Sequence, residues 1–309
     1  MLSAKPRSTQ TRSTASTPAT IYRLRYSYWQ GDERRGVNGS AMAFLKKMNQ
    51  GLHALHPSAM LIAEDSTAYP GVTKAVEDGG LGFDYKWDLG WMHDTLQYLQ
   101  AHPLDRGRMP EKITFSIHYT YNERYILPFS HDEVVHGKDT ILNKLHGSME
   151  DQFRQARLLY LYMMTHPGKQ LNFMGNELAM LREWDENREV DWHLTENADH
   201  TNFLLYITKL NRLYCQTPAL WTLDHSADGF KWVDNISDNP CVFGYTRTDG
   251  KETVLVLLNF SDVSANLTPD PNLKATLLLN THGSNHTGNG LPHSILPYCG
   301  LLFRVINAN

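Results

Sequence analysis

Apolar and polar positions follow two different patterns along the chain, and the change comes near residue 222. From Ile21 to about Trp221, helical periodicity alternates with short, continuous apolar runs. Such runs are typical of strands buried on both faces of a parallel sheet, so this part is predicted to be α/β. After about Leu223, short strand-like runs follow one another without helical patterns between them, which predicts an antiparallel β domain.

Helical patterns are clearest in three segments. The first begins at Ser40, a residue type that caps helices, and Pro57 stops it. Its apolar residues are predicted to share one face: Ala41, Phe44, Leu45, Met48, Leu52 and Leu55. A second helix is predicted over Phe153–Met164, and a third carries Phe203, Ile207, Leu210 and Tyr214 on one face.

Three apolar runs in the α/β part end in polar, chemically capable residues. The runs cover 59–63, 125–129 and 171–174, and they lead into Glu64-Asp65, Ser130-His131-Asp132 and Gly175-Asn176-Glu177. Active sites of α/β barrels and open parallel sheets are built at the C-terminal ends of strands. An acid at one strand end also serves to cap the following helix, but three such ends in succession favour a functional site.

The C-terminal part is predicted to contain short strands joined by turns. Thr248-Asp249-Gly250 is a hairpin signal between two of them. The predicted strands are Gly229–Val233, Cys241–Arg247, Thr253–Asn259, Ala275–Asn280 and Pro297–Ile306. The organisation expected from these patterns is a leader over residues 1–20, an α/β domain over 21–222 and an all-β domain over 223–309.

Residues 1–20 differ in composition from the rest of the chain. They contain nine Ser or Thr and no acid, and the first acidic residue is Asp32. This composition predicts disorder. Two interpretations stay open: an organelle transit peptide, or a leader of foreign or artefactual origin.

Composition narrows the functional classes. A net charge of −4 lacks the basic footprint of nucleic-acid binding, and no run approaches the ~18 apolar residues of a membrane-spanning helix. The three cysteines, Cys215, Cys241 and Cys299, are odd in number and widely spaced. They predict reduced thiols and hence a cytoplasmic protein, rather than a disulfide scaffold or a zinc ribbon.

Glu64 and Asp132 are the leading candidates for catalysis, because carboxylates at neighbouring strand ends can converge on one cleft. Glycoside cleavage needs such a set, one acid to protonate the leaving oxygen and others to stabilise or trap an oxocarbenium-like centre. His131 is placed to donate to a sugar hydroxyl. His136 is five residues from His131, whereas the helical two-histidine zinc motif needs four, so no metal site is predicted. His136 itself is either a substrate contact or a loop histidine bonded to backbone.

Aromatic residues cluster between Phe83 and Trp91. Trp87 and Trp91 could stack on the apolar faces of sugars, although aromatic rings more often fill cores. Both interpretations stay open here. The sequence contains neither a phosphate-binding loop nor a G-x-S-x-G nucleophile elbow, which excludes the common NTPase and serine-hydrolase classes.

Four ordered motifs resemble the bacterial 1,4-α-glucan (glycogen) branching enzymes of the α-amylase superfamily. They are MLIAEDST at 60–67 with YPGV at 69–72, GGLGFDYKWDLGWMHD at 79–94, LPFSHDEVVHGK at 127–138, and FMGNE at 173–177. The resemblance runs from about Ile21 to the C-terminus, including the loop at residues 283–285. Asp88 stands where the family usually has Asn, which is a small departure.

The resemblance implies the C-terminal half of a (β/α)8 TIM barrel, strands five to eight, followed by an antiparallel β-sandwich domain. It implies that Glu64 is the general acid/base, that Asp132 stabilises the transition state and that His131 binds substrate. Trp87, Trp91 and His136 are the further candidate substrate contacts. The implied reaction cuts an α-1,4 linkage and passes the glucan to a 6-hydroxyl, with no metal and no organic cofactor.

One part of the family pattern has no match in the sequence. The family's nucleophilic aspartate lies in an R-V-D-A-V type segment, which should fall just before Ile21, and residues 13–20 contain no carboxylate. We therefore expect the isolated chain to have little or no branching activity. Other interpretations are a glucan-binding fragment, one half of a split enzyme completed by an N-terminal half, and an α-amylase-type hydrolase.

Overall fold

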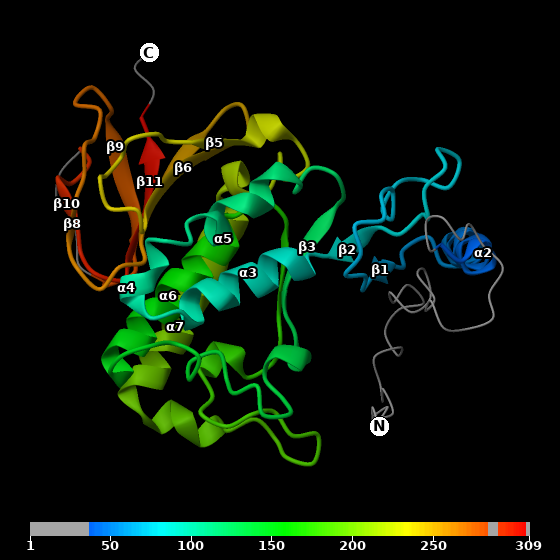
Figure 1. Ribbon diagram of the computed structural model, residues 1–309, viewed down its shortest axis with the longest axis horizontal. Helices are drawn as coiled ribbons and strands as arrows, with labels where there is room; N and C mark the ends of the chain where they lie inside the picture. Colours follow the sequence, from blue (N-terminus) through cyan, green and yellow to red (C-terminus); the bar gives the residue numbers. More distant parts are fainter. Residues whose placement is uncertain (1–36, 284–289, 307–309) are drawn as a thin grey trace. The chain divides into compact units, whose positions relative to one another are not determined.

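The computed structural model describes residues 37–283 and 290–306 (Figure 1). Residues 1–36, which include the predicted leader over 1–20, lie outside the described residues. Residues 284 and 285 of the loop at 283–285 also lie outside them. The described chain forms two compact units. Of the described residues, the first unit contains 37–90 together with Tyr119–Ile126, and the second contains Trp91–His118, 127–283 and 290–306. The domain boundary predicted near residue 222 is a different division and stays a prediction.

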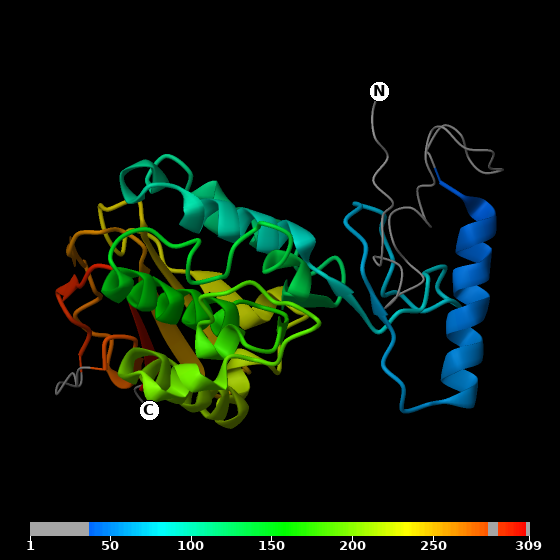
Figure 2. The same ribbon diagram turned by 90° about the horizontal axis from the view of Figure 1, so that it is seen from below.

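The first unit packs one long helix, α2 (Gly39–Leu55), against a small apolar cluster. The cluster consists of Leu45, Ala63, Val72, Leu81 and Phe83, with Met42, Met48, Leu61 and Tyr69 around it. Figure 2 shows α2 along its full length. Asn49 is also buried on this face, and its side-chain amide donates a hydrogen bond to the Leu81 carbonyl oxygen at 2.8 Å.

Two details predicted for this helix are wrong. Asn38, not Ser40, is the N-cap, because its side-chain oxygen accepts a hydrogen bond from the Ala41 amide. The predicted apolar face also fails at Phe44 and Leu55, which are 61% and 76% exposed. The buried face of α2 includes Asn49. This face is therefore rotated about the helix axis relative to the apolar face that hydrophobicity alone predicts.

A four-stranded sheet has the order β1 (Ile62–Ala63), β2 (Tyr85–Trp87), β3 (Tyr125–Phe129) and β4 (Lys169–Asn172). β1 pairs in parallel with β2, and β2 pairs in parallel with β3, as predicted for this part of the chain. β3 matches its predicted bounds, whereas β1 is shorter and β4 begins earlier than predicted. The periodicity did not reveal β2, which is only three residues long. The structure thus confirms a mixed α/β arrangement containing parallel strands.

The second unit contains α3 (Leu89–Gln100) from Trp91 onward, and it contains α4 (Pro103–Arg106), α5 (Glu111–Thr114), α6 (Met149–Thr165) and α7 (Ala198–Gln216). α6 and α7 confirm the second and third predicted helices and pack on each other. Ser148 caps α6 by accepting the Asp151 amide, and Gly168, with φ +118°, follows its end. The short 3-10 helices are Phe115–His118, His131–Glu133, Asn176–Leu178, Trp192–Glu196, Pro218–Leu220 and Ala227–Gly229.

The C-terminal residues form antiparallel sheets, as predicted. Five strands are arranged in the order β5 (Phe230–Trp232), β6 (Val242–Thr248), β7 (Thr253–Asn259), β11 (Cys299–Val305) and β9 (Ala275–Asn280). A separate pair joins β10 (Ser294–Ile295) to β8 (Ala265–Asn266), and these two-residue strands were not predicted. Gly250, with φ +87°, lies in the hairpin between β6 and β7.

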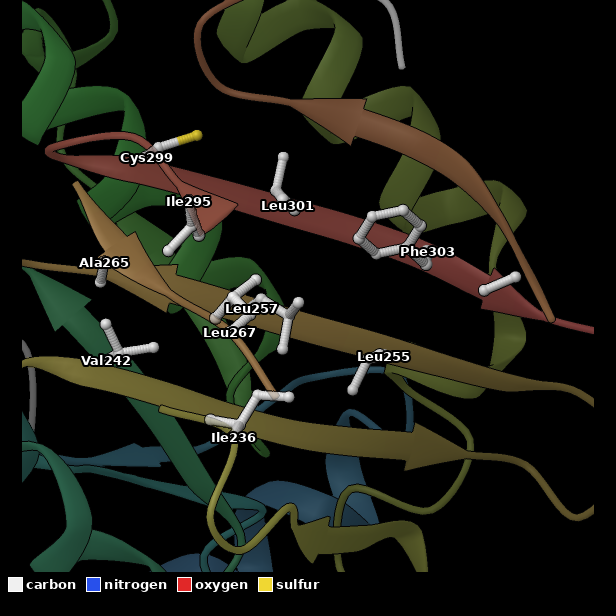
Figure 3. Close-up of a cluster of buried hydrophobic side chains, with 11 residues drawn as sticks. Ile236, Val242, Leu255, Leu257, Ala265, Leu267, Ile295, Cys299, Leu301 and Phe303 are labelled. Carbon is white, nitrogen blue, oxygen red and sulfur yellow. The ribbon is translucent and has the colours of Figure 1, made fainter. Parts of the chain in front are cut away.

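Apolar side chains from both sheets form one core in this region. Leu255, Leu257, Leu301 and Phe303 belong to the larger sheet, and Ile295 comes from the smaller pair (Figure 3). The larger sheet is also packed through β7 and β11 against α6. Within residues 37–283 and 290–306, no helix is long and apolar enough to cross a membrane.

Candidate active site

Two adjacent acids at the end of β1 have different surroundings. Asp65 is buried, and its Oδ2 lies 3.1 Å from Nζ of Lys86, which is buried as well and comes from β2. Asp65 also accepts hydrogen bonds from the amide and the hydroxyl of Thr67, at 3.1 and 2.8 Å. Glu64 is half-buried. Asp65 therefore has a structural role, and Glu64 is the acid at this strand end that remains a catalytic candidate.

A second buried carboxylate of the first unit belongs to Glu123. Its oxygens accept the backbone amides of Val72 and Thr73, at 2.9 and 2.7 Å, and the hydroxyl of Thr73. Burial, together with the negative charges of Asp88, Glu123 and Asp65, raises the pKa of Tyr125 well above its usual range. The Glu123 carboxylate thus holds the loop at Val72 and Thr73.

The two candidate tryptophans have different environments. Trp87 is half-buried in β2, opposite Ile126 of β3. Trp91 is 1% exposed, and its ring packs against Tyr162, Phe129 and His166 with centroids 5.3–5.9 Å apart. The structure therefore favours the packing interpretation for Trp91, because its ring is enclosed by other side chains.

Asp88, the departure from the family pattern, is buried in the first unit. Its Oδ1 accepts a hydrogen bond from the hydroxyl of Tyr119 at 2.9 Å. The neighbouring Gly90 leaves room for this hydroxyl, since a Cβ there would lie 2.7 Å from it. An aspartate is therefore accommodated at this position with a defined donor.

His131 and Asp132 lie together at the end of β3. Residues 126–129 of this strand are buried, and Ser130 caps the 3-10 helix His131–Glu133 by accepting the Asp132 amide. Nε2 of His131 lies 3.3 Å from Oδ1 of Asp132, and the two side chains are 43% and 32% exposed. A rigid strand thus presents a carboxylate and an imidazole to solvent, as predicted for this strand end.

The His131 imidazole is held by two aromatic rings that the sequence reasoning missed. Phe173 follows β4, and its ring lies 5.8 Å from the imidazole. Trp184 lies 5.9 Å away at an interplanar angle of 82°, and it also packs edge-on against Phe173. Phe173 was part of a recognised motif, but nothing in the local pattern around Trp184 indicated a contact with His131.

His136 lies on the loop after Asp132, is exposed and has a φ of +60°. Glu183, which the sequence reasoning also missed, accepts hydrogen bonds from the amides of Gly137 and Asp139. These two bonds lower the pKa of Glu183. Burial lowers the pKa of Lys144, whose ammonium donates to carbonyl oxygens of the same loop.

The candidate residues are divided between the two units. Glu64 and Trp87 belong to the first unit, and His131, Asp132, His136 and Trp91 belong to the second. Within the described ranges, no group of three or more His, Cys, Asp or Glu side chains is arranged to hold a metal ion.

Comparison with known proteins gives a consistent family. No family model matches the chain. The "1,4-alpha-glucan branching enzyme GlgB" of Geobacillus stearothermophilus is 44% identical over 237 residues, which is 76% of this chain and 37% of that enzyme. The enzyme of the same name from Bacillus subtilis (strain 168) is 43% identical over 238 residues, 76% of this chain and 38% of that enzyme. The matched region therefore spans little more than a third of these relatives.

Solved structures with the same fold include an α-amylase from H. orenii, with a TM-score of 0.58 and 16% identity over 86% of this chain and 57% of that chain. The structure of trehalose-6-phosphate hydrolase from Bacillus licheniformis has a TM-score of 0.61 and a sequence identity of 14%. The match covers 90% of this chain and 62% of that chain. At these identities the likeness shows the fold alone.

Proposed function

We propose that this relative of the bacterial 1,4-α-glucan branching enzymes acts on α-1,4-glucans, with Glu64 and Asp132 as its catalytic carboxylates. The observation that carries the proposal is the strand end at β3. There a partly exposed carboxylate lies against a partly exposed imidazole, inside a chain that is 44% identical to a branching enzyme. We also infer the finer architecture implied by the resemblance, in which strands of a (β/α)8 barrel precede a β-sandwich.

The proposed chemistry assigns one task to each side chain. Glu64 protonates the glycosidic oxygen that leaves and later accepts a proton from the incoming 6-hydroxyl. Asp132 stabilises the positive charge that develops at the anomeric carbon, and His131 donates a hydrogen bond to a glucosyl hydroxyl. Trp87 offers a half-buried ring for stacking on a glucose face.

A retaining transfer also requires a carboxylate that attacks the anomeric carbon, and no segment of the sequence matches the one in the family. The region that matches the branching enzymes thus supplies two of the three acids, and a polypeptide that carries the remaining barrel strands of the family is the partner we propose. Loss of a nucleophile costs covalent enzymes several orders of magnitude in rate, which is why we expect the chain alone to be nearly inactive.

The proposal is tested by incubating the chain with amylose, alone and with a polypeptide that supplies the missing strands. We expect new α-1,6 branches, measured by debranching and chain-length analysis, only in the mixture. Glu64→Gln should abolish them, whereas Glu77→Gln, at an exposed acid of the same unit, should not. Release of reducing ends without branches would favour the hydrolase interpretation. Failure of the chain to bind maltoheptaose would contradict the proposal altogether.

The cysteines support a reducing compartment, and we infer the cytoplasm. All three are free thiols, and burial raises the pKa of Cys299 to about 11. A buried thiol with a raised pKa is chemically inert, so such residues fit a packing role.

A further inference from the structure

The loop that follows Asp132 has three residues in the left-handed region of backbone conformation. His136 and Asp139 have φ values of +60° and +68°, and Gly137 between them has +78°. Residues other than glycine seldom adopt the left-handed region, and they stay there only where surrounding contacts hold them. Contacts from other parts of the molecule therefore help to hold this conformation.

Glu183 makes two contacts that hold it. Its Oε2 accepts the Gly137 amide at 3.0 Å, and its Oε1 accepts the Asp139 amide at 2.6 Å. A single carboxylate thus bridges two backbone amides that flank Lys138, which fixes the direction in which both peptide groups point. Hydrogen bonds to an ionised acceptor are also stronger than those between neutral groups.

Lys144 binds the backbone carbonyl groups of the same loop. Its ammonium donates to the carbonyl oxygens of Glu133, Lys138 and Asp139 at 2.7, 2.6 and 2.5 Å. Glu183 therefore takes the loop's amides while Lys144 takes its carbonyls. The residue after Glu183 adds a third link, since the Trp184 amide donates to the Val134 carbonyl at 2.9 Å and its ring contacts His131.

An open cavity lies beside this loop. Gly137, Lys138 and Lys144 border an open cavity of about 600 Å³, whose other lining residues include His93 and Gln97 of α3. Residues 136–139 are exposed, whereas Val135 and Thr140 on either side are buried, so hydrogen bonds hold the exposed turn between two packed ends. Removal of the Glu183 carboxylate leaves room for the loop to collapse.

We propose that Glu183 is a positioning residue for glucan binding. Its carboxylate sets the backbone at His136–Asp139 and thereby presents the exposed side chains of His136 and Lys138 to the glucan. The inference rests on the proposed function, because it concerns the loop that leads out of the Asp132 strand end. Glu183 itself is not assigned a contact with the sugar.

The experiment compares the whole chain with three variants, Glu183→Ala, Glu183→Gln and Glu186→Ala. Glu186 is an exposed glutamate three residues further along, so its replacement removes the same charge without touching the loop amides. Affinity for maltoheptaose is measured by calorimetry, and amide hydrogen exchange at Gly137 and Asp139 is measured by NMR. A melting curve for each variant checks that the fold is intact.

We expect Glu183→Ala to weaken maltoheptaose binding about ten-fold and to speed exchange at both amides. Glu183→Gln should recover part of the affinity, because its amide oxygen still accepts one of the two bonds. Glu186→Ala should behave like the wild type. Partial recovery in Glu183→Gln distinguishes positioning from a general loss of stability in Glu183→Ala.

Three results would overturn the inference. If Glu183→Ala binds as tightly as the wild type, the carboxylate does not position a binding loop. If Glu183→Gln binds no better than Glu183→Ala, the charge rather than the acceptor geometry is responsible. If the wild type does not bind maltoheptaose, the proposed function fails first, and this inference fails with it.

Discussion

In the first unit, the carboxylate of Asp65 is enclosed with the ammonium of Lys86 and two donors from Thr67. In the second unit, the carboxylate of Asp132 is 32% exposed and lies against His131, which is also partly exposed. Both acids follow parallel strands, and both belong to motifs that resemble those of the branching enzymes. Position at a strand end therefore does not make an acid catalytic. Exposure and the nature of the partner separate the structural acid from the candidate catalyst.

The largest expected difference between these acids is in stability. Asp65→Ala leaves a buried lysine without its counter-charge, which should cost about 3–5 kcal/mol in the free energy of unfolding. Asp132→Ala removes a partly exposed side chain and should cost less than about 1 kcal/mol. Urea unfolding followed by circular dichroism measures both, and equal losses would contradict the distinction.

The two tryptophans repeat the comparison between a packed and an accessible side chain. Trp91→Ala empties a core position and should lower the free energy of unfolding by about 3–5 kcal/mol. Trp87→Ala should cost less stability but weaken maltoheptaose binding about 3- to 10-fold, through loss of a stacking surface. Calorimetry with maltoheptaose and urea unfolding separate the two effects. If a folded Trp91→Phe variant binds maltoheptaose more weakly than the wild type, the packing interpretation of Trp91 is contradicted.

Buried and exposed groups should also differ in how they respond to pH. Burial, with a smaller effect from the Arg247 charge, lowers the pKa of His166 from 6.5 to about 3, although the hydrogen bond to the Pro167 carbonyl opposes this. The unfolded chain then binds a proton below about pH 6.5 that the folded chain excludes, so stability falls as the pH falls from 6.5 towards 3.

His166 should make the free energy of unfolding fall by up to about 1.4 kcal/mol for each pH unit below 6.5. His166→Gln should remove this contribution between pH 7 and pH 5, measured as the difference in unfolding free energy across that range. Above pH 7, where His166 is neutral in both states, the variant and the wild type should show parallel curves. An unchanged slope in the variant would mean that another group is responsible.

The smallest expected effect concerns the start of α2. Asn38→Ala removes the side-chain oxygen that accepts the Ala41 amide and should cost about 1 kcal/mol. Ser40→Ala, at the cap that the sequence predicted, should change the free energy of unfolding by less than about 0.5 kcal/mol. Hydrogen exchange of the first-turn amides checks the assignment, and a larger loss for Ser40→Ala would contradict it.

Elements with strong local patterns were predictable. The run at Tyr125–Phe129, the periodic segments that became α6 and α7, and the hairpin around Gly250 each carry a signal within a few residues. Very short strands such as β2 and β8 carry no such signal, because two or three residues cannot establish a period.

The candidate site was predictable only in part, for a different reason. His131 and Asp132 could be placed because a buried strand ends directly before them. The ring of Trp184 and the carboxylate of Glu183 reach this region across 44 to 53 residues of sequence, a distance at which hydropathy carries no information. Motif resemblance found the acids, but it did not find the residues that hold them.

The sequence by itself determined the strand at Tyr125–Phe129, the helices α6 and α7 and the longer antiparallel strands, and it placed acids at strand ends, since these follow from local periodicity and chain order. Only the tertiary structure decided that Asp65 is paired, that Trp91 is enclosed and that Glu183 holds the loop after Asp132. These outcomes depend on burial and on hydrogen bonds between distant residues. Such contacts form only when the chain has folded, so no local pattern in the sequence records them.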